Sequence, residues 1–128
     1  MRVLIIDDSP DMAELLGEII GDMGCETVLA NSGREALELM TKAGPFDLCL
    51  VDWKMPEMSG LEFVQAIRAQ PQYEFIKLIM ITGMTEMDDV VAALTAGANE
   101  YLMKPFSREM VMDKLRLCGF HIDMHSNI

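Results

Sequence analysis

The chain has 128 residues, of which 51% are hydrophobic, and it carries 21 acidic against 10 basic side chains for a net charge of −11. This length and apolar content suit one compact domain with its own core and leave no room for a second. The negative charge disfavours nucleic acid and anionic membrane surfaces as partners, and favours metal cations and proteins with a basic face.

We expect neither a membrane anchor nor a secretion signal from this sequence. No apolar run approaches the roughly 18 residues that span a bilayer, and the opening apolar stretch runs straight into two aspartates instead of a small-residue cleavage site. The three cysteines, Cys25, Cys49 and Cys118, lack the spacing of metal ligands and cannot all pair. We therefore expect reduced thiols in a cytoplasmic protein without membrane insertion.

Short runs rich in β-branched residues alternate along the chain with longer segments whose apolar residues recur at helical spacing. The predicted strands, in chain order, cover about 3–6, 26–30, 46–51, 76–82 and 99–103. The predicted helices follow them at about 12–23, 33–43, 59–69, 86–97 and 107–118. This strict alternation predicts an α/β fold in which a doubly wound parallel sheet of five strands is covered on both faces by five helices.

Residues that start and stop helices support these boundaries. Ser9 precedes a first-turn proline, and both Ser32–Glu35 and Ser59–Glu62 have the pattern of a capping box. Gly24 and Gly97 each follow a helical pattern at the place where a left-handed residue is expected. The first, third and fourth strands are apolar throughout, so we expect them at the centre of the sheet.

Chemically active side chains follow the predicted strands where they end. The first strand ends in Asp7 and Asp8, the third in Asp52, the fourth in Thr82 and the fifth in Lys104. In an open parallel sheet, ligands bind beyond these carboxyl ends, where the strand order reverses. Clustered carboxylates repel one another unless a cation lies among them. Two or three protein oxygens completed by water are typical of Mg²⁺ and not of a many-oxygen Ca²⁺ site.

Together these residues resemble the receiver domain of two-component response regulators, and among its members the stand-alone, CheY-like ones. The resemblance covers residues 2 to about 118. It rests on Asp7-Asp8, Asp52 with Met55-Pro56 and Gly60 behind it, Thr82-Gly83, Tyr101 and Lys104-Pro105-Phe106. It implies a monomer with the flavodoxin-like strand order 2-1-3-4-5, a receiver domain at 1–120 and a C-terminal tail at 121–128.

The resemblance also implies a role for each residue of the site. Asp52 would accept a phosphoryl group from a phosphohistidine or a small phosphodonor. Asp8 and Asp52, with the backbone carbonyl of Lys54, would bind Mg²⁺ directly, and Asp7 would act mostly through coordinated water. Lys104, whose peptide bond to the following proline would be cis, would contact a phosphoryl oxygen as a point charge.

Two further pairs of residues have roles implied in the same way. Thr82 would donate its hydroxyl to the phosphoryl group, and its movement would let Tyr101 turn inward, changing the face formed by the last two helices and the strand between them. Lys54 and Met84 would flank the path of the hydrolytic water and tune the lifetime of the phosphoryl group.

Taken singly, each of these residues also has an ordinary structural explanation. Asp7 and Asp8 could supply negative charge near a helix N-terminus, and Asp52 could be a loop acid. Thr82 could be a simple β-former and Tyr101 a half-buried sheet residue. The combination, and not any one residue, carries the functional interpretation.

The resulting hypothesis is a phosphorylation-controlled signalling switch. It would take its phosphoryl group from a sensor histidine kinase or a histidine phosphotransfer protein, and would bind a protein target through the changed face. It would catalyse only its own phosphorylation and dephosphorylation, so we do not expect an enzyme in the usual sense.

Three alternatives compete with this hypothesis. An aspartate-nucleophile phosphatase needs a second acid two residues after the nucleophile, where this chain has Lys54. A flavin or nucleotide carrier needs a glycine-rich or hydroxyl-rich phosphate loop after the first strand, where this chain has acids. The third alternative, that the chain is the receiver at the front of a larger regulator, remains open, although nothing basic, linker-like or domain-sized follows the last predicted helix in this sequence.

Overall fold

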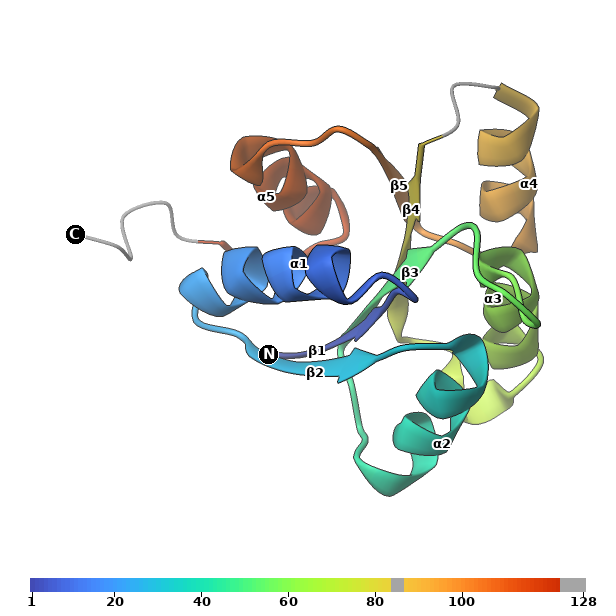
Figure 1. Cartoon of the computed structure of the whole chain (residues 1–128). Coiled ribbons are helices and arrows are strands. Elements are labelled where there is room, and N and C mark those ends of the chain that lie inside the picture. The colour runs from blue at the N-terminus through green and yellow to red at the C-terminus, as the bar shows by residue number, and fades with distance from the viewer. Residues whose placement is uncertain (84–86, 123–128) are drawn as a thin grey trace.

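The structure is a computed structural model that describes residues 1–83 and 87–122 (Figure 1). Its strands are β1 (Arg2–Ile6), β2 (Glu26–Ala30), β3 (Leu48–Asp52), β4 (Lys77–Thr82) and β5 (Glu100–Met103). Its helices are α1 (Pro10–Asp22), α2 (Gly33–Lys42), α3 (Gly60–Arg68), α4 (Met87–Ala96) and α5 (Arg108–Leu117), with a 3₁₀ turn at Pro71–Tyr73. Among the described helices, none combines the length and apolarity needed to cross a membrane.

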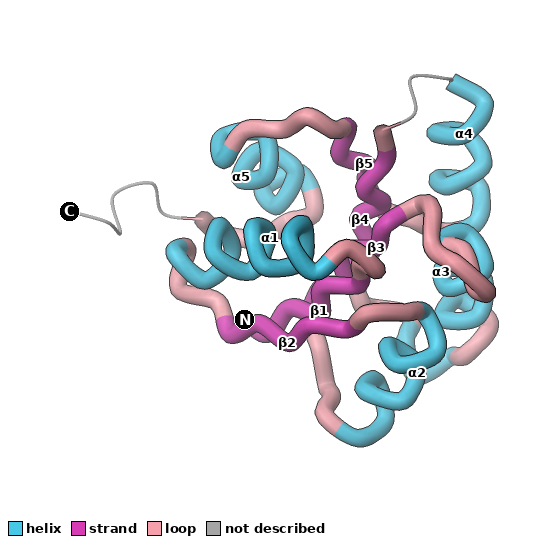
Figure 2. Tube along the Cα trace, in the orientation of Figure 1, coloured by secondary structure: helices cyan, strands magenta, loops and turns pink. Residues whose placement is uncertain are grey.

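The five strands form one parallel sheet in the order β2-β1-β3-β4-β5, which confirms the predicted fold and strand order. Helices α1 and α5 cover one face and α2, α3 and α4 cover the other (Figure 2). The central strands alternate side chains between the two faces, as the pleat requires, so Leu4 and Cys49 pack under α2–α4 whereas Ile5 and Leu50 pack under α1 and α5. The sheet thus separates two apolar clusters.

The third strand begins and ends later than predicted. Its first residue is Leu48, because Asp47 lies in the preceding loop, where its N–H donates to the carbonyl of Arg2 at 2.9 Å. Its last residue is Asp52, which pairs in register with Ile81 of β4. Asp52 is therefore part of the sheet, and the strand itself fixes its backbone.

The helix ends agree with the sequence patterns except at Ser32. Ser59 and Glu62 form the complete predicted capping box of α3. Ser32 accepts from the N–H of Glu35, but the Glu35 carboxylate accepts from Asn31 instead of from Ser32. The second predicted capping box is therefore wrong in one half, because the glutamate reaches one residue further back along the chain.

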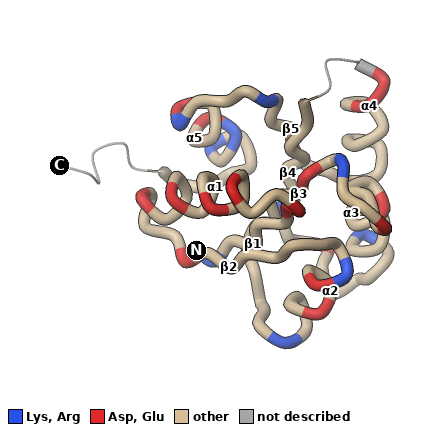
Figure 3. The backbone as a smooth tube through the Cα atoms, in the orientation of Figure 1, with Lys and Arg blue, Asp and Glu red and all other residues tan. Residues whose placement is uncertain are grey.

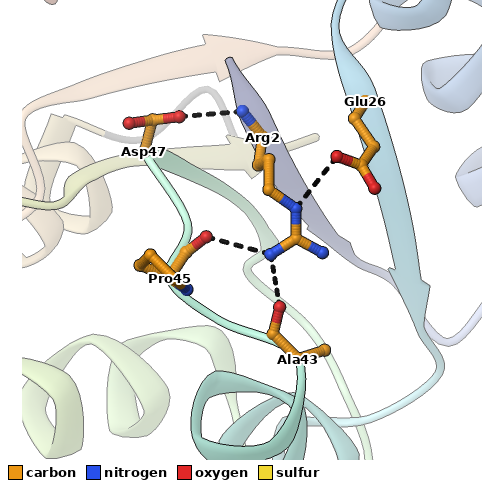
Figure 4. A network of polar contacts seen from close by, with 5 residues as sticks. All are labelled: Arg2, Glu26, Ala43, Pro45 and Asp47. Carbon is orange, nitrogen blue, oxygen red and sulfur yellow. Dashed lines mark hydrogen bonds and ion pairs between the residues drawn. The ribbon is translucent and has the colours of Figure 1, made fainter.

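Arg2 binds together several segments at the amino-terminal edge of the sheet (Figure 4). Its backbone N–H donates to Asp47 at 2.8 Å, and its Nε pairs with Glu26 at 3.1 Å. Its guanidinium also donates to the carbonyls of Ala43 and Pro45. This network fixes the amino-terminal ends of the strands, whereas the chemically active side chains lie at the carboxyl-terminal ends.

Arg68, the last residue of α3, has a similar role on the other half of the sheet. Its guanidinium donates to the carbonyls of Gly97 at 2.9 Å, Tyr73 at 2.9 Å and Ile76 at 2.8 Å, and to the side-chain oxygen of Asn99 at 2.9 Å. The segments that lead into β4 and β5 are therefore both hydrogen-bonded to one side chain.

The described chain ends at Ile122, two residues past the expected domain boundary. The Ile122 side chain is buried in the cluster beneath α1 and α5. The Arg116 guanidinium lies 3.5 Å from its carbonyl oxygen. The packed part of the chain thus reaches Ile122, and the division into 1–120 and 121–128 stays a prediction.

Candidate functional site

Asp52 is a buried carboxylate held rigidly at the carboxyl end of the central strand β3. Only 7% of the residue is exposed. The strand before it pairs with β4, and the next residue, Trp53, donates to the carbonyl of Ile81 at 2.8 Å and accepts from Gly60 at 3.0 Å. The loop after β3 therefore folds back over the strand end, and Asp52 has little freedom to move.

Gly60 makes this return of the chain possible. A Cβ atom at position 60 would lie 2.2 Å from the carbonyl oxygen of Asp52 and 2.8 Å from the terminal methyl of Met80. No side chain fits there, so the first turn of α3 can approach the strand only because residue 60 is glycine. Within the loop, Glu57 has a φ of 67°, and Met58 donates to the carbonyl of Pro56 at 2.8 Å across it.

Three carboxylates meet beside this strand end. Oxygens of Asp7, Asp8 and Asp52 all lie within 4.8 Å of one another, and Figure 3 shows acidic positions gathered where β1 and β3 end. Asp7 is buried and accepts the N–H of Ser9 at 2.9 Å, whereas Asp8 is exposed. The second oxygen of Asp7 is buried without a hydrogen-bond partner among the described residues. This donor set fits a hard cation such as Mg²⁺.

Burial and nearby negative charge make Asp7 and Asp52 hard to ionise. Burial raises the pKa of Asp52 to about 6, and the neighbouring Asp7 charge adds to the rise while Lys104 opposes it. Burial also raises the pKa of Asp7, an effect that the hydrogen bond from Ser9 partly offsets. A cation bound among these oxygens would favour the ionised form of each carboxyl.

Lys104 reaches Asp52 from the loop after β5. Its Nζ lies 3.4 Å from a carboxylate oxygen of Asp52. Its N–H donates to the carbonyl of Thr82 at 2.8 Å, and its peptide bond to Pro105 is cis, as the sequence interpretation expected. Thr82 itself is buried at the end of β4, with 4% of the residue exposed. The backbone of Lys104 is thus tied to the strand that carries Thr82.

The side chains of Asp52 and Lys104 lie at a surface cleft. The cleft has a volume of about 290 Å³ and is lined by Asp52, Trp53, Lys54, Gly83 and Lys104. Lys54 is exposed and therefore free to contact a bound molecule or solvent there. Met84, the other residue predicted to tune the lifetime of a phosphoryl group, lies outside the described residues.

Tyr101 lies apart from this cleft. It is half-buried on β5, in register with Met80, and packs against the cluster beneath α2–α4. Its ring centroid lies 4.2 Å from the Nζ of Lys114 on α5. The structure therefore brings together Asp7, Asp8, Asp52 and Lys104, places Thr82 beside them, and leaves Tyr101 on the edge strand.

The sequence interpretation missed three residues that the structure adds. Trp53 lines the cleft, and its position directly after Asp52 was the available signal. Glu100 and Lys114 form an ion pair of 2.8 Å beside Tyr101. Nothing in the spacing of these two residues pointed to their contact, because one lies on a strand and the other on the following helix.

Comparison with known proteins agrees with this geometry. The family model described as response regulator receiver domain matches residues 3–116. A chemotaxis protein CheY homolog of Campylobacter jejuni is 39% identical over 116 residues, covering 90% of this chain and 89% of that protein. The response regulator protein PilR of Pseudomonas aeruginosa is 42% identical over 120 residues, which are 91% of this chain but 26% of PilR.

Solved structures agree as well. The chemotaxis response regulator CheY4 of Vibrio cholerae superposes with a TM-score of 0.84 at 35% identity, over 91% of this chain and 97% of that one. The match of the family model over most of the chain, the shared strand order and the acids at the strand ends lead to one assignment. The chain belongs to the response regulator receiver domain family.

Proposed function

We propose that this protein is a phosphorylation-controlled signalling switch in which Asp52 is the phosphoacceptor. The observation that supports this proposal is the set of charged groups around the Asp52 carboxylate. One oxygen of the Asp52 carboxylate lies 3.4 Å from the Lys104 ammonium, and oxygens of Asp7, Asp8 and Asp52 lie within 4.8 Å of one another. This arrangement offers a nucleophile, a fixed positive charge and a cation site at one point, which are the parts that phosphoryl transfer needs.

In the proposed reaction, an oxygen of Asp52 attacks the phosphorus of a phosphohistidine on a kinase or phosphotransfer protein. The new O–P bond forms as the P–N bond breaks, and the imidazole nitrogen leaves with its electron pair. Lys104 then contacts a phosphoryl oxygen in place of the Asp52 oxygen. Asp8, Asp52 and the carbonyl of Lys54 would hold Mg²⁺, with Asp7 acting through water; the ion supplies charge neutralisation at the equatorial oxygens.

The proposed output runs from the phosphoryl group to the edge of the sheet. The Thr82 hydroxyl would donate to a phosphoryl oxygen, and Tyr101 would turn inward on β5. The face of α4, β5 and α5 would then bind a protein target. Lys54 and Met84 would set how fast water removes the phosphoryl group.

We propose a cytoplasmic monomer that receives its signal from a histidine kinase and turns over no outside substrate. Relatives of similar length are named as chemotaxis proteins, which favours a target in motility control. The receiver portion of a longer regulator is the second candidate, because the match to PilR covers only 26% of that protein.

Phosphorylation at Asp52 is tested by intact mass after incubation with Mg²⁺ and acetyl phosphate. The wild type should gain one phosphoryl group, and Asp52→Asn should gain none, because an amide is not a nucleophile of this kind. Asp113→Asn removes an exposed carboxylate on α5 and is the matched control that should still be labelled. An adduct that survives in Asp52→Asn, or that forms equally well in excess chelator, would contradict the proposal.

Magnesium binding is tested separately through Trp53. This residue is the single tryptophan of the chain and lines the cleft, so its fluorescence should change as Mg²⁺ is added. Asp8→Asn should weaken the apparent affinity by at least about tenfold, since a ligand or its supporting charge is lost. Asp11→Asn, an exposed acid in the first turn of α1, should leave the titration unchanged. Equal titrations for both variants would refute the cation site.

A further inference from the structure

Two charged side chains converge on Tyr101. The Lys114 ammonium lies 4.2 Å from the centroid of the Tyr101 ring. One carboxylate oxygen of Glu100 accepts from Lys114 at 2.8 Å and from the backbone N–H of Tyr101 at 3.2 Å. Glu100 thus fixes the position of the ammonium relative to the backbone that carries the ring.

The burial of this pair distinguishes it from an ordinary surface ion pair. The Lys114 and Glu100 side chains are each 22% exposed, against 35% and 68% for the Arg116–Asp113 pair on the same helix. Partial exclusion of water strengthens both the ion pair and the attraction between the ammonium and the aromatic face. An exposed pair of the second kind contributes little.

We propose that Lys114, anchored by Glu100, is a clamp that holds the Tyr101 ring in its position in the unmodified chain and so opposes activation. The inference rests on the proposed function, in which the ring changes position when Asp52 is phosphorylated. In this proposal, turning the ring inward would take it away from the ammonium, so the contact would favour only one of the two positions. Both residues are positioning residues, since neither lies in the cleft.

Because the ring position and the phosphorylation site are coupled in this proposal, the clamp should also change the affinity of the site for ligands. A contact that stabilises one ring position weakens the binding of any ligand that favours the other, by at most the factor by which it shifts the ring equilibrium. Removing a partly buried cation–π contact should therefore strengthen binding of a phosphoryl mimic by about threefold to tenfold. Asp52, Asp8 and Lys104 stay unchanged in such a variant.

The first measurement reads the ring directly. The chain has two tyrosines, so labelling with 3-fluorotyrosine gives two ¹⁹F signals, which Tyr73→Phe assigns. Lys114→Met keeps the length of the side chain and removes its charge, and it should shift and average the Tyr101 signal. Lys114→Arg keeps the cation and should restore the wild-type signal. Arg116 lies on the same helix, where its guanidinium contacts Asp113 and the Ile122 carbonyl, so Arg116→Met is the matched control.

The second measurement titrates beryllofluoride in the presence of Mg²⁺, read through Trp53. The clamp predicts tighter binding in Lys114→Met, an intermediate effect in Glu100→Gln and no change in Arg116→Met. An unchanged ring signal in Lys114→Met, or a changed ring signal with unchanged affinity, would overturn the proposal. A wild type that does not bind beryllofluoride would refute the proposed function and with it the coupling, whereas the ¹⁹F spectra would still decide whether the clamp exists.

Discussion

Replacing Asp52 with asparagine is expected to stabilise the metal-free protein by about 2–3 kcal/mol above pH 7, because each pKa unit corresponds to about 1.4 kcal/mol. The folded protein raises the pKa of this carboxyl from 3.8 to about 6, chiefly through burial and then through the Asp7 charge. The fold therefore disfavours the ionised carboxylate, and asparagine keeps its shape without its charge.

Because the pKa of Asp52 is raised in the folded protein, the stability difference between wild type and Asp52→Asn depends on pH. Between pH 3.8 and about 6 the folded wild type binds more protons at Asp52 than the unfolded chain does. Its free energy of unfolding consequently falls as the pH rises through this range, and the full penalty is present above it. The difference between Asp52→Asn and the wild type should be close to zero near pH 4 and reach its maximum above pH 7.

Urea denaturation in excess chelator, from pH 4 to pH 8, measures this difference. Asp113→Asn, on the exposed side of α5, serves as the control and should follow the wild type throughout. Added Mg²⁺ should reduce or reverse the advantage of Asp52→Asn, because the ion stabilises the folded wild type that binds it. Parallel pH profiles for wild type and Asp52→Asn would show that the carboxylate is not destabilised in the fold.

The second large effect is expected from Gly60→Ala, which should lower the free energy of unfolding by about 3 kcal/mol. The added methyl would stand 2.2 Å from the backbone oxygen of Asp52. Backbone on both sides is held by hydrogen bonds, so α3 or the end of β3 must move to accept it. Because Asp52 would move with the strand end, labelling by acetyl phosphate should also slow.

Gly21→Ala is the matched control for this substitution. Gly21 lies within α1, and apart from its chain neighbours and its own helix backbone no heavy atom lies within 4 Å of an added Cβ. The same methyl group there should raise the free energy of unfolding by about 0.5–1 kcal/mol through helix propensity. Urea midpoints of the two variants decide the matter, and a Gly60→Ala protein as stable as the wild type would show that the close approach is not required.

The order of strands and helices could be predicted because each element has a recognisable local sequence pattern. Apolar strands such as 48–51 must be buried on both faces, and alternation with helices leaves a parallel sheet as the arrangement that buries them. The acids were found for a related reason, since parallel strands end at a common edge. Asp52, Asp8 and Lys104 could therefore be predicted to lie close together, although Lys104 and the two acids are far apart in the chain.

Other features depend on contacts that no local pattern encodes. Asp7 and Asp8 are neighbours in sequence, yet only Asp7 is buried. The contacts of Arg2 with Ala43 and of Arg68 with Gly97 join segments distant in the chain, and arginines on a strand or a helix carry no mark of such partners. The clamp of Lys114 on Tyr101 was hidden for the same reason.

The separation of the core into two clusters by the sheet has a consequence for how the protein can vary. Side chains beneath α2–α4 and side chains beneath α1 and α5 share no cluster, and substitutions at sites without common partners usually add in free energy. One side of the domain can therefore accumulate changes suited to a new binding partner while the packing of the other side is preserved. Divergence of specificity within such a domain does not require the whole interior to be rebuilt.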